Sequence, residues 1–110
     1  MGFIFYLSKK NTTMSQFMIV VRLPEYLDNE FVKLIPKQRS HVDRLMADNT
    51  IFSYSLSLDR TQLWIIAAAE EEREIIEMMQ GFPLYDWMKY DIQPLMFHSH
   101  GLPIIPISLN

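Results

Sequence analysis

The chain has 110 residues, of which 49% are hydrophobic and 21% charged, which fits one globular domain and excludes a mainly disordered chain. It contains no cysteine, so a disulfide framework, a thiolate zinc site and a cysteine nucleophile are excluded. The formal net charge of −3 argues against a broad surface for nucleic acid.

No segment approaches the roughly 20 apolar residues of a bilayer span, and residues 1–7 lack the flanks of a signal peptide. We therefore expect a cytoplasmic protein with neither a membrane nor a nucleic-acid partner. Residues 1–13 precede a second methionine and are interpreted as an N-terminal extension or arm, followed by a domain over residues 14–97. Residues 98–110 form an apolar tail that we expect to pack on the domain or on a partner subunit.

The first strand is predicted over residues 17–23, where Val and Ile residues end at a proline. Residues 28–48 carry an apolar stripe, which includes Gln38, at three- and four-residue spacing, and this predicts a helix with Asp28 as its N-cap. Pro36 interrupts the pattern, because a proline inside a helix removes one backbone hydrogen bond and costs about 3 kcal/mol. Either the helix kinks there, or a short turn precedes a helix that begins at Pro36.

Residues 51–58 alternate between apolar and serine positions, which predicts a second strand. Its apolar face would hold Phe52, Tyr54, Leu56 and Leu58, and its other face Ser53, Ser55 and Ser57. A short loop without glycine, residues 59–61, joins it to a return strand over residues 62–69, so the two strands should be antiparallel.

A second helix is predicted over residues 70–80, and a last strand from residue 89 or 90 to about 97. Pro94 within that strand implies an edge position or a bulge. Strand-helix-strand thus occurs twice, which predicts a ferredoxin-like α+β fold with an antiparallel sheet in the order 4-1-3-2. Both helices would cover one face, and the bare second face favours a homodimer.

Three segments resemble the muconolactone isomerase family, within the dimeric α/β barrel superfamily. They are Val21-Arg22-Leu23-Pro24, the stretch Met-Gln-Gly-Phe-Pro-Leu-Tyr-Asp-Trp-Met at residues 79–88, and Tyr-Asp-Ile-Gln-Pro-Leu at residues 90–95. The resemblance implies a homodimer or larger ring, a ligand cavity between sheet and helices, and proton transfer on a lactone. The chain departs from the family pattern in two places, since the second strand carries no basic residue and Lys37-Gln38-Arg39 replaces an expected acid.

Proton transfer requires a base of suitable pKa, and we single out Asp86, His98 and His100 as candidate catalytic residues. His98 and His100 share one face of a strand end, which would also suit a metal, but the sequence places no third ligand. The alternative is that these two histidines are simply solvated. We expect no metal site and no cofactor.

Six residues are candidates for ligand binding, each with a structural alternative such as core packing, an ion pair or an exposed sheet surface. They are Arg22, Ser53, Ser55, Tyr85, Trp87 and Tyr90. Because the first and last strands would run antiparallel, Arg22 should approach Asp91 or Asp86, with Tyr90 in the same polar cluster. His98 should lie near Phe17 or the other subunit.

Together these features favour a small isomerase or lyase that moves a proton on a small cyclic or unsaturated acid or lactone. The alternative is a non-catalytic ligand-binding or assembly module on the same fold. The two differ in one respect: catalysis requires the titratable candidates to meet in one enclosed pocket.

Overall fold

The computed structural model describes residues 14–98. The expected arm and most of the expected tail, His100 included, lie outside these residues. The element order confirms the predicted sequence of strands and helices. The elements are β1 (Ser15–Arg22), α2 (Asn29–Ala47), β2 (Ile51–Leu56), β3 (Gln62–Ala69), α3 (Glu72–Gln80), the 3₁₀ helix η1 (Tyr85–Trp87) and β4 (Lys89–Leu95).

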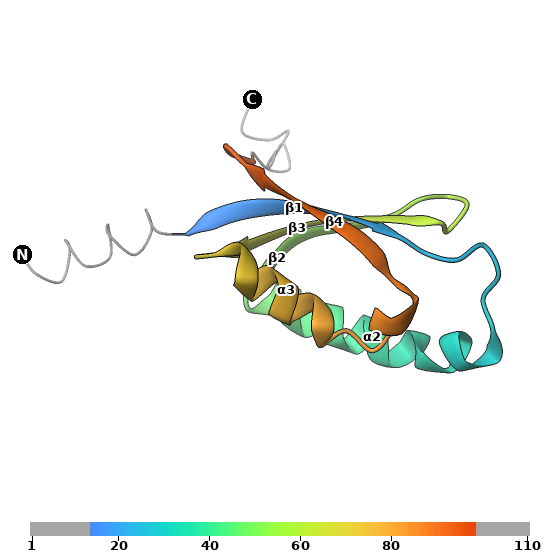
Figure 1. The fold of residues 1–110 in the computed structure, drawn as a ribbon. Coiled ribbons are helices and arrows are strands. Elements are labelled where there is room, and N and C mark those ends of the chain that lie inside the picture. Colours follow the sequence, from blue (N-terminus) through green and yellow to red (C-terminus); the bar gives the residue numbers. More distant parts are fainter. Residues whose placement is uncertain (1–13, 99–110) are drawn as a thin grey trace, which may run out of the picture.

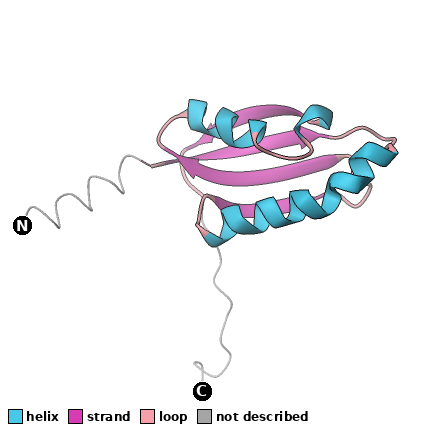
Figure 2. Cartoon of the chain, turned by 90° about the horizontal axis from the view of Figure 1, so that it is seen from below, coloured by secondary structure: helices cyan, strands magenta, loops and turns pink. Residues whose placement is uncertain are grey.

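The four strands form one antiparallel sheet in the order β2-β3-β1-β4, as predicted. Both helices lie on the same face of this sheet (Figures 1 and 2). The fold is therefore the ferredoxin-like α+β arrangement. Pro94 lies on β4, which within residues 14–98 pairs with β1 alone, so its missing N–H does not interrupt an interior strand pairing.

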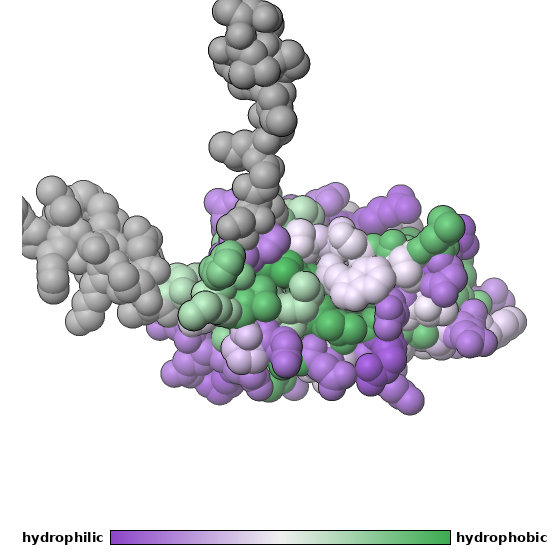
Figure 3. Space-filling model, turned by 90° about the horizontal axis from the view of Figure 1, so that it is seen from above, coloured by the Kyte–Doolittle hydropathy of each residue, from purple (hydrophilic) through white to green (hydrophobic). Residues whose placement is uncertain are grey.

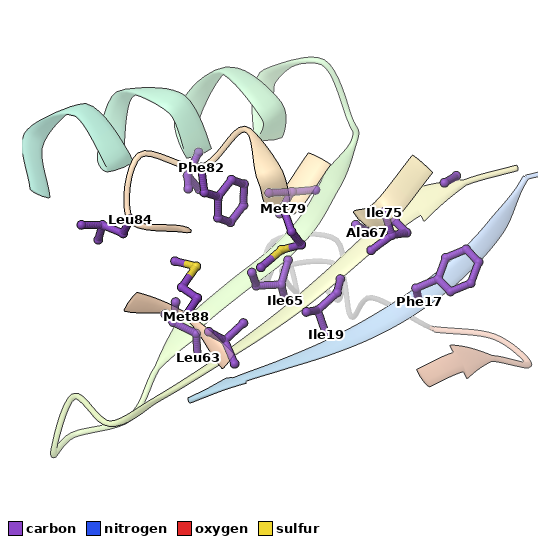
Figure 4. Close-up of a cluster of buried hydrophobic side chains, with 14 of the residues drawn as sticks. Phe17, Ile19, Leu63, Ile65, Ala67, Ile75, Met79, Phe82, Leu84 and Met88 are labelled. Carbon is purple, nitrogen blue, oxygen red and sulfur yellow. The ribbon is translucent and has the colours of Figure 1, made fainter. Parts of the chain in front are cut away.

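The core fills the space between the sheet and the two helices (Figure 4). Alternate residues of β1 and β3 point into it, and Ile19 and Ile65 are fully buried at its centre. Met79 of α3 and Phe82, which follows that helix, close the layer from the other side. The alternation of β1 leaves its other residues on the face away from the helices, which we call the open face.

Pro36 lies inside α2, which runs as one helix from Asn29 to Ala47. The alternative of a separate helix that begins at Pro36 is therefore wrong. Asp28 is the N-cap, as predicted, and its carboxylate accepts a hydrogen bond from the Phe31 N–H at 2.8 Å. Burial of one face of α2 offsets the cost of the proline, since packing overrides local propensity.

The second strand differs from its predicted alternation. A register irregularity between Ile51 and Ser53 shifts the pattern, so Ile51 rather than Phe52 is the fully buried residue at its start. The strand ends at Leu56, and Leu58 lies fully exposed in the following turn. Ser57 belongs to that turn as well, where its hydroxyl donates to Asp59 at 2.7 Å.

The β2–β3 turn contains no glycine, and Arg60 adopts the left-handed backbone conformation in it. Arg60 has φ 65°, a conformation unusual for a residue other than glycine. Oδ1 of Asp59 accepts hydrogen bonds from both the N–H and the hydroxyl of Thr61, at 3.0 and 2.7 Å. These bonds, with the one from Ser57, lower the pKa of Asp59 and fix the turn that holds Arg60.

Candidate functional site

A cavity of about 310 Å³ lies between α2 and the end of the sheet that carries the β2–β3 turn. Most of its wall is apolar. That part of the wall consists of Leu23, Leu27, Phe31, Ile35, Leu56, Leu63 and Leu84. Four polar side chains complete the lining, namely Gln38, Arg39, Tyr54 and Arg60. An apolar cavity with a few polar groups is the usual form of a small-molecule site.

Gln38 is buried and connects two walls of the cavity. Its Oε1 accepts a hydrogen bond from the Leu84 N–H at 3.2 Å, and its Nε2 donates to the Tyr54 hydroxyl oxygen at 3.3 Å. The backbone N–H can only donate, so it fixes which end of the amide is the oxygen. Because Tyr54 accepts from Gln38, its own hydroxyl hydrogen remains available to donate to a ligand.

The Tyr54 phenol is held in its neutral form. Burial raises the pKa of Tyr54, and the hydrogen bond from Gln38 lowers it by a smaller amount. At neutral pH this group is therefore a hydrogen-bond donor and not a base.

Two guanidinium groups supply the charge at the cavity. Arg39 comes from α2 and Arg60 from the β2–β3 turn, and both are exposed. Neither forms an ion pair with another residue between 14 and 98. No carboxylate lines the cavity within that part of the chain, so its electrostatic preference is for an anion.

Arg22 lies elsewhere, on the open face. It forms an ion pair with Asp91 at 3.3 Å, as the antiparallel register predicted. The side chains are 54% and 75% exposed, so the pair contributes little to stability. Ser53 and Ser55 share this face, since they stand opposite Ile66 and Trp64 of β3.

Tyr85, Trp87 and Tyr90 belong to the helix side of the sheet. Tyr90 is in register with the buried Val21, and its ring centroid lies 6.3 Å from that of Tyr85. Burial, together with the neighbouring Tyr85, raises the pKa of Tyr90. Arg22 and Tyr90 therefore lie on opposite faces, and the expected cluster of the two is wrong because adjacent positions on a strand alternate in direction.

Trp87 packs its ring edge-on against Phe31 of α2, with centroids 5.6 Å apart. Its indole N–H donates to Oδ2 of Asp28 at 3.5 Å, so η1 is tied to the N-terminus of α2. Asp86 is exposed on η1 and is not part of the cavity wall.

His98 lies at the opposite end of β1 from Arg22. Its backbone N–H donates to Oε1 of Gln16 at 2.8 Å, so it lies by the residue that precedes Phe17 in β1. None of the candidate bases described by the structure lines the cavity. Sequence reasoning missed the cavity residues, although one signal was available: Gln38 is a polar residue within the apolar stripe of a helix.

Fold and cavity together define a ferredoxin-like α+β protein with a largely apolar cavity beneath its first helix. The chain belongs to the muconolactone delta-isomerase family, whose sequence profile matches residues 16–100. No curated protein sequence matches the chain. Within residues 14–98, no three His, Cys, Asp or Glu side chains are grouped to hold a metal, and neither helix has the length and hydrophobicity of a membrane span.

Proposed function

We propose that this protein binds a small cyclic or unsaturated carboxylic acid, or its lactone, in the cavity beneath α2 and shifts a double bond in it by proton transfer. One observation carries the proposal: an apolar cavity combines a directed hydroxyl donor with two guanidinium groups that form no ion pair within residues 14–98. Membership of the muconolactone delta-isomerase family supports the reaction class.

Arg39 and Arg60 would bind the ligand carboxylate, since a guanidinium presents paired N–H donors that match carboxylate geometry. The Tyr54 hydroxyl would donate to the ligand carbonyl. As a base removes a proton from the neighbouring carbon, negative charge develops on that carbonyl oxygen, and the donor stabilises it. The proton returns to a different carbon, so the double bond moves and no atom is lost. Gln38 acts through Tyr54 and is a positioning residue.

The candidate bases are Asp86, His98 and His100. Because Asp86 and His98 lie outside the cavity of their own subunit, we propose that a base reaches it in a homodimer or larger ring. Apolar residues gather in the middle of the open face, framed by polar ones (Figure 3). Trp64 is 37% exposed there, and burial of an exposed apolar face favours self-association. We also propose a cytoplasmic location.

A second function is favoured by the chemistry of the cavity wall. No histidine and no carboxylate lines it among the described residues, and Tyr54 is neutral. A non-catalytic binding module would need only the guanidinium groups and the hydroxyl donor. The two functions make the same prediction for binding and different predictions for proton exchange.

Calorimetric titration with unsaturated lactones and keto acids tests the binding site. Arg60→Gln and Tyr54→Phe should each weaken binding about tenfold or more, as expected for a lost charge-assisted or buried hydrogen bond. Arg73→Gln is the matched control, because Arg73 lies on α3 and pairs with Glu71 and Glu77. If Arg22→Gln weakened binding and Arg60→Gln did not, the ligand site would lie on the open face and not in the cavity.

Proton exchange then separates the two functions. In D₂O, an isomerase should incorporate deuterium at the carbon next to the carbonyl of a bound ligand, as followed by NMR. Tight binding without deuterium incorporation would assign the non-catalytic function. Absence of binding by every member of the panel would refute both.

A further inference from the structure

A second hollow lies on the outer side of α2, away from the cavity. It has a volume of about 380 Å³ and is lined by Pro36, Lys37, Ser40, His41, Arg44 and Pro83. We call it the outer groove. The α2 residues fall at spacings of three and four, so one stripe of the helix presents all of them. Pro83, from the segment that follows α3, forms the facing wall.

The polar groups of the outer groove are all hydrogen-bond donors or cations. Lys37 and Arg44 carry fixed positive charge, and neither forms an ion pair with a residue between 14 and 98. Among the residues that the structure describes, no carboxylate lines the groove, although the chain has 13 acidic and 10 basic residues. Two cationic side chains without a neighbouring carboxylate, in a protein with a net negative charge, indicate affinity for an anion.

His41 and Arg44 fix each other's geometry. The Arg44 Nη2 lies 3.3 Å from the His41 Nδ1, and a guanidinium can only donate, so the imidazole is neutral and carries its hydrogen on Nε2. Its ring packs edge-on against Phe82, with centroids 5.4 Å apart. Arg44 and Lys37 are the charged groups of α2 that line the groove with it, and the packed segment 81–83 carries none. Burial and Arg44 both lower the pKa of His41.

We propose that the outer groove binds the phosphate group of free phosphate or of a small phosphate monoester. Such a dianion offers three or more acceptor oxygens. The guanidinium of Arg44, the ammonium of Lys37 and the hydroxyl of Ser40 are donors suited to them. A carboxylate carries one negative charge, whereas a phosphate dianion carries two and matches the two cations of the groove. Pro36 and Pro83 provide apolar walls for the organic part of an ester.

NMR titration of the His41 imidazole tests the proposal. Phosphate should raise the measured pKa of His41 by about 1 relative to sodium chloride at the same ionic strength, because a bound dianion favours the imidazolium. The ionic-strength match removes simple screening, which would act in the same direction. Phenyl phosphate should bind more tightly than inorganic phosphate if the site takes esters, and equally if it takes free phosphate.

Arg44→Gln and Lys37→Gln should each weaken phosphate binding about tenfold. Lys33→Gln is the control, since Lys33 lies on the same helix but pairs with Glu30 at 3.5 Å. Equal His41 pKa values in phosphate and chloride, or equal losses in Lys33→Gln and Lys37→Gln, would overturn the site. These outcomes are independent of the cavity, whose residues the variants leave unchanged.

Discussion

Replacement of Gln38 by leucine probes the hydrogen bonds that cross the cavity. The Leu84 N–H would lose its acceptor in a buried position, which costs about 1–3 kcal/mol. Loss of the bond to Tyr54 adds about 1 kcal/mol, and the apolar leucine side chain recovers part of this. We therefore expect Gln38→Leu to lower the free energy of unfolding by about 1–3 kcal/mol after this recovery. Tyr54→Phe breaks one bond beside the cavity and should cost only about 1 kcal/mol.

Urea denaturation followed by tryptophan fluorescence measures these differences, at one fixed protein concentration because self-association also stabilises the folded state. Gln80→Leu is the control, since Gln80 is exposed at the end of α3 and should change stability by less than about 0.5 kcal/mol. The double variant Gln38→Leu/Tyr54→Phe should be no less stable than Gln38→Leu alone, because the first substitution already breaks the shared bond. A Gln38→Leu midpoint equal to that of Gln80→Leu would refute the directed hydrogen-bond pair.

Asp28→Ala should destabilise the protein by about 1 kcal/mol through loss of the α2 cap, and Asp28→Asn should recover most of it; equal urea midpoints for Ala and Asn would contradict the capping role. A lowered His41 pKa means that the unfolded chain binds that proton more readily, so stability should fall as pH decreases through 6.5 and then level off. His41→Gln should remove this decrease in stability between pH 7.5 and 5. The same pH dependence of stability in His41→Gln as in the wild type would contradict the role of His41. Trp64→Glu should convert a self-associated protein to monomer by light scattering, whereas a wild-type species of 13 kDa would exclude assembly through the open face.

The order of the strands was predictable because it follows from local patterns and handedness. Two strand-helix-strand units leave few ways to build a sheet, and the antiparallel register of β1 and β4 then predicted that Arg22 would approach Asp91 or Asp86, of which Asp91 is the partner. Pro94 indicated an edge strand or a bulge for an equally local reason, since a proline has no N–H to donate to a neighbouring strand.

The cavity was not predictable from the same patterns. Its central contact joins Gln38 to the backbone of Leu84, 46 residues later, and no local spacing encodes that distance. No glycine marks the register irregularity after Ile51 in the sequence. Because of this irregularity, the residue at the start of β2 that faces the helices differs from the predicted one. Arg60 lines the cavity from a turn in which it takes the left-handed backbone conformation that glycine usually adopts.

The proline within α2 has a consequence for hydrogen exchange and for access to the cavity. Pro36 has no N–H, so the carbonyl of Val32 receives no helical hydrogen bond across that turn. Segment 29–35 is therefore joined to the rest of α2 by an incomplete ladder, and it contributes Phe31 and Ile35 to the cavity wall. Its amides should exchange with solvent faster than those that follow, in a local opening that leaves the sheet intact. A ligand could enter beneath these two turns without the protein unfolding.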